Sequence, residues 1–368
     1  MDENKILLLA LYLPQFHPIP ENDLWWGKGF TEWTKTAGAK PLFRSHVQPH
    51  LPADLGFCDL RVPEVRQEQA HLAAEHGLSG FCYWHYWFGN GKRLLERPFD
   101  EVLASGKPDY PFCLAWANES WTGIWHGLKD KTLIEQMYPG RDDDLRHFDL
   151  VVNAFRDKRY IKIDHKPVFI VYRPEQLPDP RSFTGLWNDL AKKTGFHGVY
   201  FIGIGPLDWD HQTAGFDDKT IHSLPLYVQM YERFRMNRLR EILLRRVLEK
   251  KPAVYPYRKL IAAFDFSLLR NYDFIPTILP NWDNSPRSGK EACIFHEATP
   301  SAFQAHLDDA VTFVLSRDRP KPKIILIKSW NEWAEGNYLE PDRQWGKKYL
   351  DVILEVIQKR GLATSYHA

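Results

Sequence analysis

Two glutamates near the end of the sequence, Glu332 and Glu335, lie three positions apart within an aromatic stretch. Breaking a glycosidic bond usually requires one protonated carboxyl group and a second, ionised carboxylate. When two carboxyl groups lie close together, the negative charge of one raises the pKa of the other, so one can stay protonated near neutral pH. If the segment forms a helical turn, this spacing places both side chains on one face. Two solvated surface glutamates would be the simpler interpretation, but the flanking Trp330, Asn331 and Trp333 favour a carbohydrate site.

The aromatic content of the chain also suits sugar binding. Its 368 residues include 14 Trp, 16 Tyr and 22 Phe, and many of the Trp lie beside polar residues. A pyranose has an apolar face and a rim of hydroxyl groups, so flat aromatic rings bind it together with carboxylates and amides. The alternative is that aromatic residues fill a large core, and for any single Trp this is the better interpretation.

Short apolar runs alternate with helical patterns along the whole chain, which is typical of βα units and a parallel sheet. We find no internal repeat or flexible linker, so we predict one domain spanning residues 1–368. Eight strands predict an α/β fold, a single TIM-like (β/α)8 barrel, because eight strands close without leaving an edge. The predicted strands are 6–12, 78–84, 111–116, 167–172, 198–204, 217–222, 274–279 and 323–328, and the predicted helices are 63–76, 93–105, 142–156, 183–194, 231–249, 300–316 and 345–360.

The residues that follow the strands of such a barrel form its active site, on long βα loops. Here these positions are rich in polar and aromatic side chains, which packing alone does not explain. Glu119 has a structural alternative, as partner of a nearby Arg or Lys, and His85 could equally be a structural histidine. The predicted substrate-binding residues are Tyr12, Gln15, His17, Trp84, His85, Tyr86, Trp116, Asn118, Glu119, Trp121, Trp282, Asp283, Trp330, Asn331 and Trp333.

Charge and cysteine content exclude several other classes of protein. The 48 basic and 47 acidic residues give a formal net charge of +1, which offers no bulk attraction to nucleic acid or an anionic membrane. The four cysteines lack the paired spacing of zinc or redox sites, so we expect reduced, buried residues. His46 and His50 have four-residue spacing, but Pro49 argues against a helix that presents both to a metal. We therefore predict no metal and no cofactor.

The N-terminal apolar run is too short to span a bilayer and lacks the flanks of a signal peptide, which predicts a cytoplasmic protein without a membrane span. The expected partner is an oligosaccharide or polysaccharide substrate. The sequence leaves the oligomeric state open.

Motifs along the chain resemble two known families. The stretch from Trp330 to Gly336, continuing to Leu339-Glu340-Pro341, resembles the catalytic loop of glycoside hydrolase family 99, where two glutamates three apart do the chemistry. Nearly the whole chain is similar to the WbsX family, whose members are named as glycosyltransferases and occur in polysaccharide biosynthesis clusters. The matching motifs are Tyr12-Leu13-Pro14-Gln15-Phe16-His17, Trp25-Trp26-Gly27-Lys28-Gly29-Phe30-Thr31-Glu32-Trp33, Gln48-Pro49-His50-Leu51-Pro52, Phe81-Cys82-Tyr83-Trp84-His85-Tyr86-Trp87-Phe88, Arg93-Leu94-Leu95-Glu96 and Trp116-Ala117-Asn118-Glu119.

The family 99 resemblance implies a particular mechanism. Glu332 would act as a base on the sugar 2-hydroxyl, which attacks the anomeric carbon to give a 1,2-anhydro sugar, while Glu335 would serve as acid and then base. The chain departs from the family 99 loop at Ala334, where that family usually has His.

We therefore predict a retaining, endo-acting glycoside hydrolase whose substrate is an α-mannoside-like or bacterial surface polysaccharide. One alternative is a glycosyltransferase of O-antigen or polysaccharide biosynthesis, although the sequence shows no phosphate-binding glycine-rich loop and its Asp142-Asp143-Asp144 run lies at a predicted helix start. The other alternative is a carbohydrate-binding barrel without catalysis. The presence of both Glu332 and Glu335 argues against it.

Overall fold

Eight parallel strands form the centre of the molecule. The structure is a computed structural model and describes residues 4–123, 132–233, 252–317, 321–364 and 366. Each strand predicted from an apolar run is present, although the seventh is reduced to two residues. The strands are β1 Leu7–Tyr12, β2 Gly80–His85, β3 Phe112–Trp116, β7 Lys166–Val171, β8 Tyr200–Gly205, β9 Asp218–Ile221, β11 Thr277–Ile278 and β13 Ile324–Ile327.

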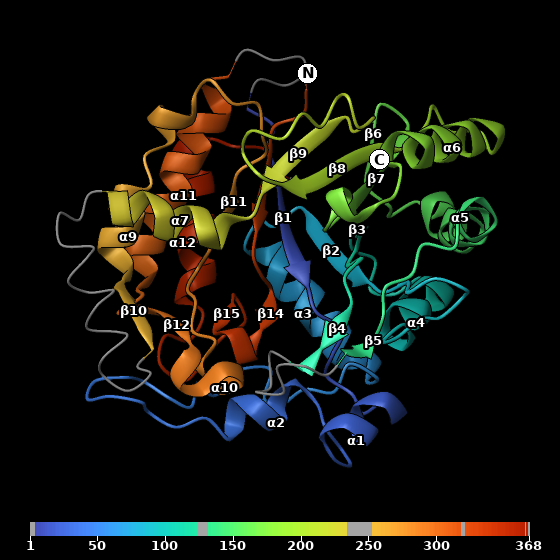
Figure 1. Cartoon of the computed structure of the whole chain (residues 1–368). Coiled ribbons are helices and arrows are strands. Elements are labelled where there is room, and N and C mark those ends of the chain that lie inside the picture. The colour runs from blue at the N-terminus through green and yellow to red at the C-terminus, as the bar shows by residue number, and fades with distance from the viewer. Residues whose placement is uncertain (1–3, 124–131, 234–251, 318–320, 365, 367–368) are drawn as a thin grey trace.

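These strands form a barrel that is almost closed (Figure 1). Neighbouring strands pair in the order β11, β13, β1, β2, β3, β7, β8, β9, and every one of these pairs is parallel. The two end strands meet where Ile275, just before β11, bridges Thr220 of β9. Ile275 N donates to the Lys219 carbonyl at 2.7 Å, and Thr220 Oγ1 donates to the Ile275 carbonyl at 2.8 Å. The predicted (β/α)8 architecture is confirmed.

Helices surround the barrel, and local features explain why two of them begin at other residues than predicted. The predicted helix 183–194 begins earlier, at Pro180, because the Asp179 carboxylate accepts a hydrogen bond from Ser182 N at 2.9 Å. The predicted helix 93–105 begins only at Arg97, after Leu95 adopts a φ of 57°. Of the predicted helix 231–249, residues 234–249 lie outside the described residues. The described helices that cover the barrel are α3 Pro63–Glu75, α4 Arg97–Ser105, α5 Arg141–Arg156, α6 Pro180–Lys193, α7 Ser223–Arg233, α9 Tyr257–Ala263, α11 Pro300–Leu315 and α12 Lys348–Arg360.

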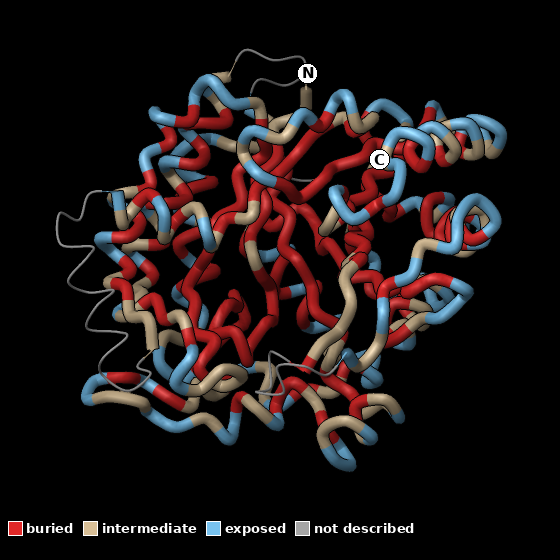
Figure 2. Tube along the Cα trace, viewed as in Figure 1, coloured by how far each residue is buried: buried red, intermediate tan, exposed pale blue. Residues whose placement is uncertain are grey.

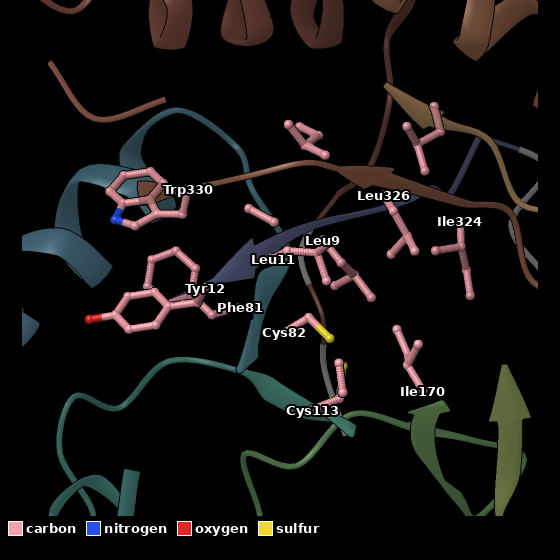
Figure 3. Close-up of a cluster of buried hydrophobic side chains, with 14 of the residues drawn as sticks. Leu9, Leu11, Tyr12, Phe81, Cys82, Cys113, Ile170, Ile324, Leu326 and Trp330 are labelled. Carbon is pink, nitrogen blue, oxygen red and sulfur yellow. The ribbon is translucent and has the colours of Figure 1, made fainter. Parts of the chain in front are cut away.

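The core lies inside the barrel and between the barrel and its helices. Every residue of β1, β2 and β3 is buried, which explains why these strands are nearly continuous apolar runs. Figure 2 shows the buried chain at the centre and exposed segments at the periphery. In Figure 3, the side chains of Leu9, Ile170 and Leu326 come from three strands and gather in the barrel interior.

Two sequence predictions concern the cysteines and membrane association. Cys58, Cys82 and Cys113 are buried and free, as expected, whereas Cys293 is only partly buried. Within the described segments, no helix combines the length and apolar character needed to cross a membrane.

The loops that follow the strands carry small elements of their own. Figure 1 shows α1, α2, α10 and the β4–β5 hairpin together at the end of the barrel to which the β1 arrow points. This is the C-terminal end of the strands, where barrel enzymes place their active sites. These elements are α1 Pro20–Trp26, α2 Glu32–Ala37, β4 Trp121–Thr122, β5 Thr132–Ile134, α10 Ser285–Ser288, β14 Asn331–Glu332 and β15 Asn337–Tyr338, and elsewhere in the fold lie β6 Lys162–Ile163, β10 Ala253–Pro256 and β12 Cys293–His296.

Candidate active site

A cavity of about 950 Å³ lies at the C-terminal end of the barrel. This volume is at the upper end of the range for small-molecule sites. Residues from the ends of several strands and from the loop helices α1, α2 and α10 form its wall. Of the predicted site residues, the wall includes Gln15, Trp84, Tyr86, Glu119, Trp121, Trp282, Glu332 and Glu335.

A short hairpin carries the glutamate pair into this cavity. Glu332 lies in β14, which pairs with β15, and Glu335 ends the single 3₁₀ turn between the two strands. The turn closes through Gly336, whose φ is 56°. A Cβ atom at Gly336 would lie 2.8 Å from Asp283 N, so a side chain here would displace the hairpin. Asn331 fixes the hairpin to the first strand, because its side chain accepts a hydrogen bond from Leu13 N at 2.7 Å.

Two cations lie against the pair. Lys328 Nζ is 3.9 Å from Glu332 Oε2 and 3.7 Å from Glu335 Oε2. Arg287 donates from one guanidinium nitrogen to Glu335 Oε1 at 2.8 Å. Glu332 has a different hydrogen-bond partner, because Trp84 Nε1 donates to its Oε1 at 3.0 Å. The two carboxyl groups therefore have different surroundings although both are buried.

This difference moves the two pKa values apart. Burial and the negative charge of Glu335 raise the pKa of Glu332 to about 8, against the opposing effect of Lys328. Burial also acts to raise the pKa of Glu335, but Lys328 and Arg287 outweigh it and hold that pKa below the usual value. In the ligand-free site, Glu332 therefore holds a proton at neutral pH and Glu335 is ionised.

Arg287 is held in turn by Glu32 of the α2 helix. The second guanidinium nitrogen of Arg287 donates to both carboxylate oxygens of Glu32, at 2.9 and 3.0 Å. Glu32 Oε1 also accepts a hydrogen bond from Ala334 N at 2.8 Å, directly before Glu335. Glu32 is 2% exposed, so this contact is shielded from water. One buried ion-pair network thus joins the loops after the first, seventh and eighth strands.

Several predicted site residues lie outside the cavity wall because strand side chains alternate between two faces. Trp84 and Tyr86 face the cavity, whereas His85 between them faces outward and its Nε2 is 2.8 Å from His147 Nε2. In the same way Glu119 lines the cavity, but the neighbouring Asn118 hydrogen-bonds to Arg173 N at 2.7 Å. The sequence prediction used the position after a strand and did not assign faces, so we reassign these outward residues from substrate contact to support of the site.

The aromatic residues behind the hairpin also have a supporting position. Tyr12 donates to Gln69 Oε1 at 2.7 Å, while Gln69 and Trp333 donate to the two oxygens of buried Glu340, both at 2.6 Å. Figure 3 shows Tyr12 and Trp330 beside Phe81, whose ring centroid is 5.0 Å from that of Tyr12 and 5.1 Å from that of Trp330. These hydrogen bonds and ring contacts hold the hairpin in position.

The remaining predicted residues outside the cavity wall are His17, Trp116 and Asp283. His17 is buried, and Trp116 Nε1 donates to the Trp87 carbonyl at 2.9 Å. Asp283 accepts hydrogen bonds from Gln48 and pairs with His46, both at 2.7 Å, and lines a separate cavity of about 220 Å³. Its backbone N donates to the Glu335 carbonyl at 2.7 Å, so Asp283 positions the hairpin through its main chain.

The sequence prediction also missed residues that the cavity wall contains. Lys328 ends the predicted eighth strand, while Tyr172, Arg173 and His222 end or follow the fourth and sixth strands. Including the last residue of every predicted strand, together with the residue after it, would have found them. Arg287 follows no strand directly, and its role depends on contacts with residues distant in the sequence.

One group of metal-ligating side chains comes together in the described part of the chain, but it lies away from this cavity. Possible ligand atoms of His211, Asp218 and Asp273 lie within 4.8 Å of one another, at the start of β9 and before β11. Lys321 Nζ is 3.0 Å from Asp273 and 3.9 Å from Asp218, so an ammonium group already balances the carboxylates. The group fits a structural ion-pair cluster.

Solved structures with a similar fold include a glycoside hydrolase and a glycoside hydrolase-like protein. A "glycoside hydrolase-like protein" aligns with a TM-score of 0.61 at 16% identity, over 97% of this chain and 95% of that one. The GH99 endo-alpha-mannosidase of Bacteroides thetaiotaomicron, in complex with bis-tris propane, aligns with a TM-score of 0.56 at 13% identity, over 98% of both chains. At these identities the likeness establishes the fold alone.

Sequence comparison identifies closer relatives. The uncharacterized protein WxcX of Xanthomonas campestris pv. campestris, in strains B100 and ATCC 33913, is 38% identical over 357 residues. These cover 96% of this chain, which spans about half the length of those relatives (50%). The family model described as "Glycosyltransferase WbsX" matches residues 8–353, and this chain therefore belongs to the WbsX family of carbohydrate-active proteins.

Proposed function

We propose that this chain is an endo-acting, retaining glycoside hydrolase that uses Glu332 and Glu335 as its two carboxyl groups. The observation that carries the proposal is the buried pair itself, in which one member bonds to Trp84 and the other to Arg287. That arrangement supplies one protonated and one ionised carboxyl group in one cavity, as glycoside cleavage requires. The endo-alpha-mannosidase among the structural neighbours supports an α-mannoside as the first substrate class to try.

The ligand-free site favours a definite division of roles within the pair. Glu332 donates its proton to the glycosidic oxygen as the bond from that oxygen to the anomeric carbon breaks. Glu335 supplies the negative charge, either as a nucleophile that bonds to the anomeric carbon or as a base that takes the proton of the sugar 2-hydroxyl while the 2-oxygen bonds to that carbon. Water then gives a proton to Glu332 while its oxygen bonds to the anomeric carbon and displaces Glu335 or the 2-oxygen; in the second case the 2-oxygen regains its proton from Glu335. The two displacements retain the configuration. This division reverses the roles implied by the family 99 resemblance, and it rests on the ion pair between Arg287 and Glu335.

Measuring the reducing ends released from α-mannans and bacterial polysaccharides, without any nucleotide sugar, tests the activity. Wild type should cleave at least one of them, and Glu332→Gln and Glu335→Gln should each abolish cleavage. Glu75→Gln, on a side chain 52% exposed in α3, is the matched control and should stay active. Cleavage that survives both site substitutions would refute the assignment of the pair.

An aryl glycoside of the cleaved oligosaccharide tests the division of roles, because its phenolate leaves without needing a proton. Glu332→Gln should still release a burst of phenolate from this substrate while losing activity on the polysaccharide, because only the second step of its cleavage still needs Glu332, and Glu335→Gln should lose both. The opposite pattern would restore the roles implied by family 99.

A second candidate function is glycosyl transfer in polysaccharide synthesis, which the family description favours. The same carboxyl pair serves if a sugar hydroxyl, instead of water, attacks the anomeric carbon. A nucleotide-sugar donor distinguishes this case, because product that forms only when that donor is supplied would refute hydrolysis as the main activity.

A further inference from the structure

The cavity continues beyond the glutamate pair to a second polar cluster, formed by Glu119, Arg173 and His222. A chain of contacts links the two groups. Trp84 hydrogen-bonds to Glu332, and the ring of Tyr172 meets that of Trp84 at a centroid distance of 5.6 Å.

The centroid of the Tyr172 ring is also 5.7 Å from that of His222, and the two rings are again nearly perpendicular. The three members of the cluster follow β3, β7 and β9, so the (β/α)8 barrel brings them to the same end as the glutamate pair. The cluster and the pair are thus neighbouring parts of one cavity.

The charges within the cluster are balanced. Arg173 contacts Glu119 Oε2 through two nitrogens at 2.9 Å, and a third nitrogen is 3.2 Å from His222 Nε2. Burial, followed by the charges of Arg173 and Lys328, lowers the pKa of His222 to about 4. The imidazole is therefore neutral at physiological pH and accepts a hydrogen bond from Arg173.

This chemistry suits an uncharged ligand with hydroxyl groups. Guanidinium donors and carboxylate acceptors lie side by side, and a hydroxyl group both donates and accepts. A diphosphate or a uronic acid carboxylate would approach the Glu119 carboxylate, which repels it, and would gain little from a guanidinium already paired. The side chains of Arg173 and Glu119 are 28% and 33% exposed, so both can reach a ligand in the cavity.

We propose that Glu119, Arg173 and His222 form a second sugar subsite, which binds the hydroxyl groups of a neutral hexose beside the one held at the glutamate pair. The inference rests on the proposed function and names its substrate class: an uncharged oligosaccharide with sugar units in both subsites. The cavity of about 950 Å³ has room for more than one unit, as endo cleavage requires.

Calorimetric binding of neutral α-manno-oligosaccharides of one to four units tests the subsite, with oligogalacturonates as the anionic probe. The background is Glu335→Gln, so that turnover does not interfere. We expect the neutral series to bind and the anionic series to bind at least tenfold more weakly. Adding Arg173→Gln or Glu119→Gln should weaken binding of the longer neutral oligomers by roughly tenfold, because one bond to a charged group is lost.

Arg360→Gln is the matched control, since its pair with Asp308 has similar exposure, 33% and 27%, and lies on the outer helices. It should leave binding unchanged. Equal affinity of the Arg173 variant and the control, preferred binding of the anionic series, or no binding of the neutral series would each overturn the subsite.

The two proposals fail in different ways. If hydrolysis is absent but neutral oligomers bind through Arg173, the subsite stands and the proposed function falls. If wild type cleaves neutral polysaccharide and Arg173→Gln cleaves it with unchanged KM and unchanged dependence on chain length, the subsite falls and the function stands.

Discussion

Replacing Arg287 with Gln removes the guanidinium from between Glu32 and Glu335, whose side chains are only 2% and 10% exposed. Removing one partner of a buried ion pair costs about 3–5 kcal/mol, because the other charge stays buried without its counter-ion. We expect a cost at the lower end of this range because two contacts remain in the variant: Lys328 stays 3.7 Å from Glu335, and Ala334 N still donates to Glu32. We expect Arg287→Gln to lower the free energy of unfolding by about 3 kcal/mol at neutral pH, measured by urea unfolding with tryptophan fluorescence.

The loss of stability should also depend on pH. Without Arg287, burial at Glu32 is opposed by the hydrogen bond from Ala334 N but no longer by a guanidinium, and Glu335 keeps Lys328 alone as its cation, so the pKa values of both carboxyls rise above their wild-type values. A carboxyl group whose pKa is raised by folding contributes stability below its unfolded pKa, and this contribution is lost as pH rises through its folded pKa. In wild type, Glu335 has a lowered pKa, so its contribution is instead lost as pH falls. The difference between variant and wild type should therefore shrink from about pH 7 toward about pH 5.

Two comparisons make the test decisive. Arg61→Gln removes an ion pair whose partners are 40% and 33% exposed, and it should cost less than about 1 kcal/mol. Combining Arg287→Gln with Glu32→Gln should cost less than the sum of the single changes, because the double variant no longer buries an unpaired Glu32. An Arg287→Gln cost as small as that of Arg61→Gln, or one that does not change with pH, would refute the reasoning.

The remaining predictions concern the rate and the hairpin. Activity should fall as pH rises through about 8, because Glu332 then loses the proton that it donates, and initial rates that stay level to about pH 10 would contradict this. Trp84→Phe removes a donor 3.0 Å from the Glu332 carboxyl, which should raise its pKa and move this alkaline limb to higher pH in the same assay. Gly336→Ala should reduce both melting temperature and activity, because its Cβ would lie 2.8 Å from Asp283 N. Gly91→Ala is the control, since its φ is also positive, at 78°, but nothing lies within 4 Å of the added carbon; an equal effect of both would exclude the clash as the cause.

The barrel was predictable because its strands are buried on both faces. Runs such as Ile324–Ile327 are apolar throughout, so they can be recognised as buried strands without knowing which elements pack against them. The seventh strand was the exception in length. It was predicted as 274–279, yet only Thr277–Ile278 pair as a strand, while Ile275 forms the single bridge that links the two ends of the sheet. Few residues pair where the two ends of the sheet meet, so the length of the strand there cannot be predicted from a sequence pattern.

The glutamate pair was predictable from local sequence, but its electrostatic surroundings were not. Glu332 and Glu335 lie in one aromatic stretch, whereas Glu32 contacts Arg287 across 255 positions and Ala334 across 302. Only the closed barrel brings such residues together. Residues such as His85, predicted as site residues, lie outside the cavity wall for a related reason, since which face a strand residue occupies depends on where the barrel axis lies.

If the proposed carboxyl pair serves both hydrolysis and glycosyl transfer, the difference between them lies elsewhere in the cavity. After the first bond breaks, the outcome depends on whether water or a sugar hydroxyl reaches the anomeric carbon. A subsite at Arg173 that holds a neutral sugar firmly would supply that hydroxyl, whereas one that releases it quickly would admit water. Neither route requires a nucleotide if the donor is itself a glycoside. If both proposals hold, the family description as a transferase is compatible with the proposed hydrolytic chemistry, and the lifetime of the sugar beside Arg173 would decide between the two outcomes.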